Sequence, residues 1–171
     1  RQRQMCIRDS LWAPWRMEYL KRKKNLEDGC VFCAKNISDG ELRDVLILHK
    51  GKEAFVVMNL YPYTNGHLLI CSNEHTERLT DLSSSVLTEV MHLSKVSMNI
   101  LNSIMNPNGF NFGANIGKAG GAGISEHIHF HLVPRWEGDT NFMPVVGQSK
   151  VIMDGLFDTY DSLKPHYDRL K

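Results

Sequence analysis

Ser-Glu-His-Ile-His-Phe-His-Leu-Val, residues 125–133, is the stretch that decides the fold and points to the chemistry. Histidines alternate here with apolar residues, a period of two that is typical of a β-strand with one face in a core. We therefore expect a strand over residues 127–133, in which same-face neighbours are roughly 6.6 Å apart. The residues expected in the core are Ile128, Phe130 and Leu132, and the residues expected together on the opposite face are His127, His129 and His131.

The segments around this strand predict an α+β domain. Apolar, β-rich segments predict further strands, and a serine cluster followed by apolar residues at helical spacing predicts one long helix. Because strands and helices do not alternate regularly, we expect a mainly antiparallel five-stranded sheet. The expected strands are 45–48, 54–60, 67–71, 110–115 and 127–133; the long helix runs from the serines at 83–85 to near Met105, a loop covers 134–150, and a short C-terminal helix extends toward Leu170.

The composition limits the classes of partner. A chain of 171 residues fits one domain, and a net charge of +1 gives no basic field for nucleic acid. No stretch approaches the ~18–20 apolar residues of a membrane span, so a cytoplasmic protein is expected. Residues 1–10 are polar, basic and without periodicity, and we expect them to be a non-native or disordered segment before a domain at 11–171.

Three imidazoles on one strand face allow two kinds of site. Alternate histidines can ligate one metal ion, as in some zinc enzymes. An imidazole can also attack phosphorus when an acceptor holds its other nitrogen and fixes the tautomer. The glycine-rich loop at 117–123 favours the nucleophile, because such a loop can aim backbone N–H groups at phosphate oxygens.

A second cluster begins with Cys30-x-x-Cys33. This spacing fits a zinc knuckle or a redox motif, and no thioredoxin-like βαβ pattern surrounds it. A closed tetrahedral zinc site would need two further ligands.

The histidine stretch resembles the histidine triad (HIT) superfamily, whose mark is H-x-H-x-H-x-x with apolar residues at x. The resemblance covers most of the chain from about Leu11. It includes Asn-Leu-Tyr-Pro-Tyr-Thr-Asn-Gly-His-Leu-Leu-Ile at 59–70 and Asn-Ile-Gly at 115–117. Val-Pro-Arg-Trp at 133–136 and Gly-Asp-Thr-Asn-Phe at 138–142 resemble the branch of diadenosine tetraphosphate phosphorylases and hydrolases.

The resemblance implies a HIT-type nucleotide hydrolase or nucleotidyltransferase, usually a homodimer, that cleaves a dinucleoside polyphosphate. His129 would attack the α-phosphate and form a nucleotidyl-histidine intermediate, while His131 and His67 orient groups around the phosphate. Water or phosphate would then release the nucleotide. The residues expected to bind the nucleotide are Asn59 at the ribose, and Asn115, Gly117, Gly121, Gly123 and Ser125 around the phosphates.

Zinc-bearing members of the family imply the missing metal ligands. His75 and His127 would join Cys30 and Cys33 around a structural Zn²⁺, which would anchor the N-terminal loop to the catalytic strand. The chain departs from the family at Gly123, where glutamine is common, so Ser125 or Lys118 could protonate the leaving group.

Three other functions stay open on the sequence. They are an adenosine phosphoramidate hydrolase with the same nucleophile, a non-enzymatic zinc-stabilised nucleotide-binding module, and a metalloenzyme that uses the histidine triad as ligands. The acceptor, the preferred base and the polyphosphate length are likewise open.

Overall fold

The computed structural model describes residues 30–33, 38–139, 152 and 154–170. The chain divides into two compact units, residues 1–31 and 32–171. Of the first unit, Cys30 and Val31 alone are described. The expectations for residues 1–10 and for most of the loop after Asp139 therefore lie outside the described residues.

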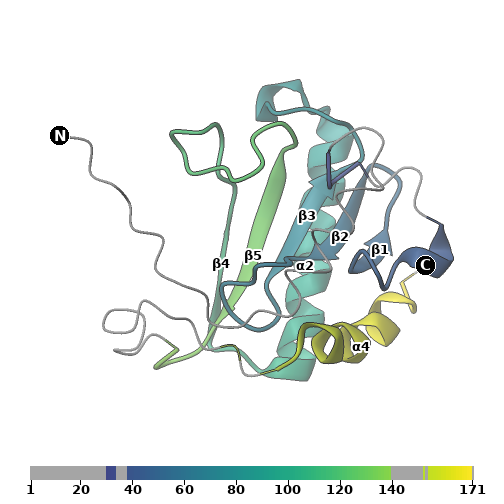
Figure 1. The fold of residues 1–171 in the computed structure, drawn as a ribbon, viewed down its shortest axis with the longest axis vertical. Helices are drawn as coiled ribbons and strands as arrows, with labels where there is room; N and C mark the ends of the chain where they lie inside the picture. Colours follow the sequence, from purple (N-terminus) through teal and green to yellow (C-terminus); the bar gives the residue numbers. More distant parts are fainter. Residues whose placement is uncertain (1–29, 34–37, 140–151, 153, 171) are drawn as a thin grey trace. The chain divides into compact units, whose positions relative to one another are not determined.

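The second unit is built on one five-stranded sheet in the order β1-β2-β3-β5-β4, with every neighbouring pair antiparallel (Figure 1). The strands are β1 (Ile47–Lys50), β2 (Ala54–Met58), β3 (Leu68–Ser72), β4 (Gly109–Gly113) and β5 (His129–Arg135). The last strand in the sequence thus lies inside the sheet. The α+β class and the five-stranded antiparallel sheet expected from the sequence are confirmed.

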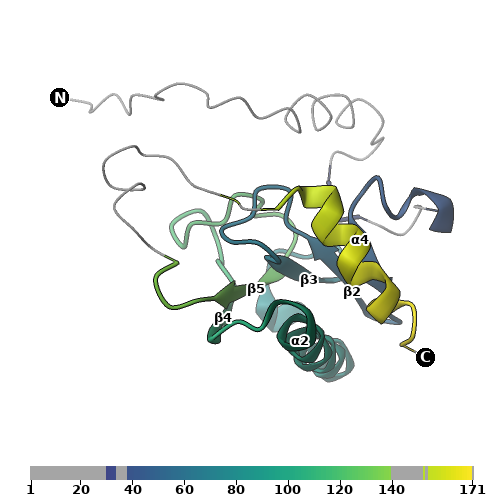
Figure 2. The ribbon, with the colours of Figure 1, turned by 90° about the horizontal axis from the view of Figure 1, so that it is seen from below.

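The two expected helices are also present. The long helix α2 (Ser84–Met105) begins after Ser83, whose hydroxyl accepts a hydrogen bond from the backbone N–H of Val86, and it ends at Asn106 in the left-handed conformation. It lies along one face of the sheet (Figure 2). Short 3-10 turns are present at η2 (Asp39–Glu41) and η3 (Leu79–Asp81).

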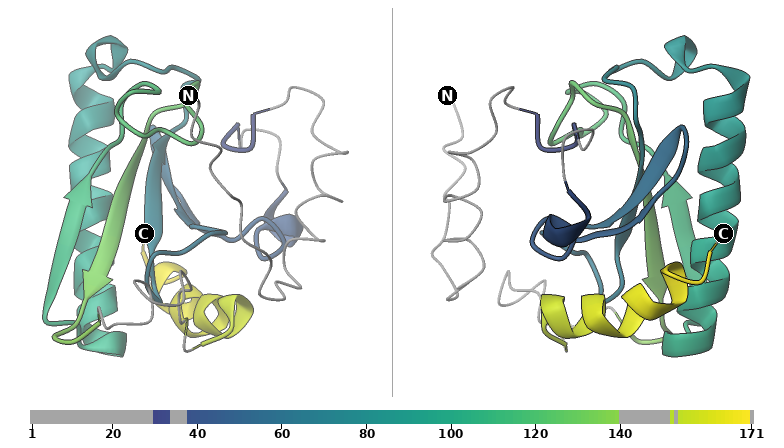
Figure 3. Two further views of the ribbon diagram at one scale, coloured as in Figure 1. Left: turned by 60° about the vertical axis from the view of Figure 1, so that its left-hand side comes forward. Right: turned by 90° about the vertical axis from the view of Figure 1, so that its right-hand side faces the viewer.

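The C-terminal helix α4 (Leu156–Tyr167) packs on β1 and crosses α2 (Figure 3). Two buried phenols fix it in place. The Tyr160 hydroxyl donates to the carbonyl of Ile47 at 2.9 Å, and the Tyr167 hydroxyl donates to Ser97 Oγ at 2.7 Å. In the described part of the chain no helix is long and apolar enough to cross a membrane.

The structure corrects the bounds of the histidine strand. β5 runs from His129 to Arg135, so His127 precedes the strand and Pro134, expected in a loop, lies within it. β3 pairs with β5 only as far as Leu132, so at Pro134 the strand has β4 as its one neighbour. Proline has no backbone N–H to donate. It is tolerated at this position because β3 forms no hydrogen bond there that could be lost.

The apolar face of this strand is only partly as expected. Ile128 and Leu132 are buried, but Phe130 is half-buried. Its ring stacks on Phe112 of β4, with centroids 6.0 Å apart. The side of the sheet near β4 is therefore less covered than its centre.

Candidate active site and metal centre

β5 places two histidines side by side on one face of the sheet. His129 pairs with Cys71 of β3 and His131 with Leu69, which fixes the register of the face that carries the histidines. Because the two histidines are two residues apart on a strand, their side chains point the same way. Their ring centroids are 5.1 Å apart in an edge-to-face arrangement.

His67 reaches this pair from the turn before β3. It is fully buried, and the backbone N–H of Tyr63 donates to its Nδ1 at 3.0 Å. Since Nδ1 accepts, Nε2 of the neutral ring carries the proton and donates to Nδ1 of His131, also at 3.0 Å. The chain of hydrogen bonds thus fixes the tautomer of both rings.

The same chain leaves His131 with an N–H group for a ligand. Because its Nδ1 accepts from His67, its proton lies on Nε2, a buried atom that has no hydrogen-bond partner within the described residues. Burial, and then the charge of the neighbouring His129 ring, lowers the pKa of His131 below its usual 6.5. At neutral pH the ring is therefore a neutral donor, and a phosphoryl oxygen would satisfy it.

The tautomer of His129 is the opposite one. Its Nδ1 lies 2.8 Å from the backbone carbonyl of His127, which can only accept, so Nδ1 carries the proton. Nε2 then has its lone pair available for attack on phosphorus. The ring is buried and contacts Phe32, with centroids 4.8 Å apart.

A candidate metal centre lies next to His129. His127 donates from Nε2 to the carbonyl of Ser72 at 2.8 Å, which leaves the lone pair on Nδ1, 3.9 Å from Cys33 Sγ. His75 Nδ1 lies 3.2 Å from the same sulfur. Burial lowers the pKa of His127, although its bond to Ser72 opposes this, and the neutral ring is the form that binds metals.

These three residues fit a zinc ion. Their ligand atoms lie within 4.8 Å of one another, and one thiol with two imidazoles is a donor set that zinc takes in tetrahedral sites. Cys30 precedes Cys33 by three residues and belongs to the first unit. Its place as the fourth ligand stays a prediction.

Comparison with known proteins shows the family of the chain. Residues 40–138 match the model of the HIT domain. The chain belongs to the HIT family. It is 35% identical over 164 residues to the AP-4-A phosphorylase of Mycobacterium tuberculosis (strain CDC 1551 / Oshkosh), covering 93% of this chain and 84% of that protein. It is 29% identical over 86 residues to the bis(5'-adenosyl)-triphosphatase of Dictyostelium discoideum, covering 50% of this chain and 57% of that protein.

Solved structures of HIT proteins share the fold. A Zn-bound histidine triad family protein from Mycobacterium smegmatis superposes with a TM-score of 0.62 at 22% identity, covering 82% of this chain and 94% of that one. A histidine triad nucleotide-binding protein from Sulfolobus tokodaii strain7 gives a TM-score of 0.60 at 21% identity, covering 81% and 89%.

Asn59 of this HIT domain contacts another side chain of the site. Its Nδ2 lies 3.3 Å from His67 Nδ1, and its Oδ1 accepts from the backbone N–H of Tyr61 at 2.9 Å. The amide therefore supports the acceptor role of His67 Nδ1. The ribose contact expected from the family stays a prediction.

The glycine-rich loop of the HIT domain is closed on itself by backbone hydrogen bonds. The N–H groups of Gly120 and Ala122 donate to the carbonyl of Gly117, and the N–H of Gly121 donates to Lys118. Gly117 and Gly121 have φ of 71° and 88°, which favours glycine at both. The nucleotide-binding roles of this loop, of Asn115 and Gly123 beside it, and of Ser125 stay predictions.

Two aromatic residues of the site were missed by the sequence interpretation. Tyr63 stacks on His131 with centroids 5.8 Å apart and contacts His67 at 4.6 Å. Phe32 lies against His129 and, at 5.8 Å, against His127. Both residues lie inside motifs that the sequence interpretation had already selected, Phe32 between Cys30 and Cys33 and Tyr63 within residues 59–70. An aromatic residue inside such a motif was the signal that could have identified them.

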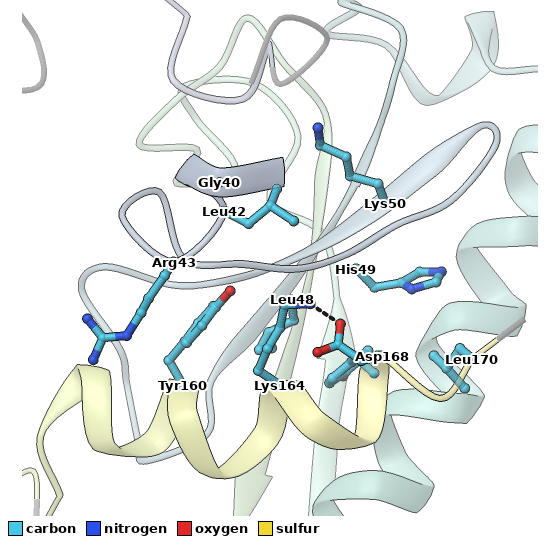
Figure 4. Close-up of a pocket in the computed structure, with 11 residues that line it drawn as sticks. Gly40, Leu42, Arg43, Leu48, His49, Lys50, Tyr160, Lys164, Asp168 and Leu170 are labelled. Carbon is cyan, nitrogen blue, oxygen red and sulfur yellow. Dashed lines mark hydrogen bonds and ion pairs between the residues drawn. The ribbon is translucent and has the colours of Figure 1, made fainter. Parts of the chain in front are cut away.

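A cavity of about 500 Å³ elsewhere in the second unit is lined by η2, β1 and α4 and contains no triad residue (Figure 4). Two of its basic groups are already paired. Arg43 binds Asp161 through two hydrogen bonds, and Lys164 forms an ion pair with Asp168. These two cations are therefore already neutralised by carboxylates.

Proposed function

We propose that this protein cleaves dinucleoside polyphosphates through a covalent intermediate on His129. The observation that carries the proposal is the hydrogen bond from His129 Nδ1 to the carbonyl of His127, because it directs the lone pair of Nε2 outward. The names of the HIT relatives, a phosphorylase and a triphosphatase of adenosine dinucleotides, support this substrate class.

In the first step Nε2 of His129 attacks the α-phosphorus. A P–N bond forms, the P–O bond to the leaving nucleotide breaks, and the leaving oxygen takes a proton from Ser125 or Lys118, the donors expected in place of the family's glutamine. The Nε2–H of His131 donates to a non-bridging oxygen, where negative charge grows in the transition state. The hydrogen bond from His67 keeps the proton of His131 on Nε2 before the substrate binds.

In the second step an acceptor oxygen attacks the nucleotidyl group, and His129 leaves with its lone pair restored. We propose inorganic phosphate as the acceptor, supported by the 35% identity to a phosphorylase over most of both chains. With diadenosine tetraphosphate the first step releases ATP, and transfer of the adenylyl group to phosphate gives ADP.

We also propose a structural zinc ion held by Cys30, Cys33, His75 and His127. Thiolates and imidazoles fill all four positions of such an ion, which leaves none for substrate. The ion would supply stability to the loops around the site, and no bond of the substrate would be made or broken on it.

A homodimer in the cytoplasm completes the proposal. β4 is an edge strand, and its Phe112 is 37% exposed, so a second copy has an unpaired edge and an apolar side chain to pack against. Light scattering of the purified chain tests the dimer, and the mass of a monomer would contradict it.

The test of the function is incubation with diadenosine tetraphosphate, with and without inorganic phosphate, for the wild type and His129→Ala. His92→Ala is the matched control, because His92 is an exposed histidine on α2. ADP plus ATP formed only with phosphate supports phosphorolysis; AMP plus ATP in phosphate-free buffer supports the nucleophile but replaces phosphate by water. A His129→Ala variant as active as wild type would contradict the proposal, and absence of both products would direct the test to adenosine phosphoramidates.

A further inference from the structure

Phe32 connects the metal ligands to the nucleophile. It is buried, and its ring lies 4.8 Å from the ring of His129 and 5.8 Å from that of His127. The next residue is Cys33, whose sulfur lies 3.2 Å from His75 Nδ1. Two adjacent residues therefore have separate roles: Cys33 offers a metal ligand, and Phe32 covers the ring of His129.

The ring of His129 needs such a contact. Its hydrogen bond to the carbonyl of His127 fixes the position of Nδ1 but leaves the ring able to swing about that contact. Within the described residues the aromatic rings packed against it are those of Phe32 and His131. His131 is itself held by the hydrogen bond from His67. The packing of Phe32 therefore sets the direction in which Nε2 of His129 points.

His127 gives the metal centre a second connection to the same ring. Its imidazole faces Cys33, and its carbonyl accepts from His129. A shift of either the Phe32–Cys33 segment or His127 would therefore change the direction of the attacking lone pair. Such a change is costly, because a misplacement of 1 Å in a reacting group can lower a rate by about 100-fold.

We propose that Phe32 is a positioning residue for His129, and that metal binding at Cys33, His75 and His127 acts on the reaction by holding Phe32 against that ring. The inference rests on the proposed role of His129 as nucleophile. It assigns a catalytic effect to an ion that touches no substrate, and it names the side chain that carries the effect.

The expected behaviour of Phe32→Ala is a fall in kcat of about 10- to 100-fold with KM changed less than about three-fold. Phe32→Leu restores apolar volume and should recover part of the loss. Both variants should keep one zinc per chain, because Phe32 offers no ligand. Phe157→Ala is the matched control, since it removes a phenyl ring from α4, whose strand contact is β1 and not β5.

The experiment combines kinetics with zinc content and with nitrogen NMR of ¹⁵N-histidine protein. In wild type the His129 signals should show one tautomer, protonated at Nδ1. In zinc-loaded Phe32→Ala, and in wild type stripped of zinc by a chelator, Nδ1 should keep its proton while the Nε2 signal shifts and broadens, because the ring can then swing about its bond to the His127 carbonyl. Phe157→Ala should leave them unchanged.

Two results would overturn the inference: kcat of zinc-loaded Phe32→Ala within two-fold of wild type, or His129 signals that do not respond to that substitution. Loss of zinc from both variants would overturn it as well, because Phe32 would then support the ligands and not the nucleophile. His129→Ala, assayed in parallel, separates this failure from that of the proposed function: if it is fully active, the nucleophile itself is wrong.

Discussion

Removing the hydrogen-bond donor to His131 Nδ1 should remove most of the contribution that His131 makes to catalysis. The change is His67→Phe, which keeps a planar ring in a fully buried position but removes both ring nitrogens. His131 Nδ1 then loses the donor now 3.0 Å away, and the Tyr63 N–H loses its acceptor. Nothing then holds the proton of His131 on Nε2.

The size of the effect follows from the hydrogen bonds that are lost. A buried polar atom left without its partner costs about 1–3 kcal/mol. At about 1.4 kcal/mol for each factor of ten, kcat/KM should fall by roughly 5- to 150-fold. The orphaned Tyr63 N–H should lower the free energy of unfolding by a similar 1–3 kcal/mol.

The assay is kcat/KM for diadenosine tetraphosphate, measured beside urea unfolding and the tautomer of His131 by nitrogen NMR. His67→Gln is the matched variant, because its amide N–H can still donate to His131, and it should keep more activity than His67→Phe. The reasoning would be refuted by a His67→Phe variant with activity within two-fold of wild type, or by one in which His131 still carries its proton on Nε2 alone.

Three further predictions concern pH, metal and packing. Since burial lowers the pKa of His131 below 6.5, the unfolded chain takes up the proton first as the pH falls. The free energy of unfolding should therefore decrease below pH 6.5 and level off below the folded pKa; urea titrations of His131→Gln should show a shallower decrease, and an identical slope would contradict this. Cys33→Ser should weaken zinc binding by more than about 100-fold and lower Tm, while an unchanged zinc stoichiometry against a competing chelator would exclude Cys33 as a ligand. Tyr167→Phe removes a buried 2.7 Å hydrogen bond to Ser97 and should cost about 1–2 kcal/mol; a double-mutant cycle with Ser97→Ala should show coupling near 1 kcal/mol, and additivity would contradict it.

Periodicity predicted the elements well because each one has a separate physical signature. The alternating histidines implied a half-buried strand, and the serine before Val86 implied the start of α2. The ends were less predictable. Pro134 was expected to stop the strand, but a single-neighbour position accepts proline, and the number of neighbours depends on pairing that sequence does not reveal.

The cluster of Cys33, His75 and His127 was predicted by resemblance and not by spacing, since 42 and 94 residues separate the sulfur from the two rings. The roles of Asn59 and Tyr63 at His67 could not be predicted. Their contacts arise from the path of the turn between β2 and β3, and a tautomer is set by distances of tenths of an ångström. Local patterns carry no information at that scale.

The position of β5 has a consequence for how the chain folds. Among the strands of the described residues it is the last to be synthesised, yet it pairs with β3 on one side and β4 on the other. Until it inserts, β4 has no partner and β3 has an open edge, so a nascent or truncated chain exposes two surfaces on which strands aggregate. The bond between His67 and His131 joins residues 64 positions apart, a loop closure that is slow to form. His67, His129 and His131 therefore come together in the same late event that closes the sheet, and a partly folded chain lacks the candidate site.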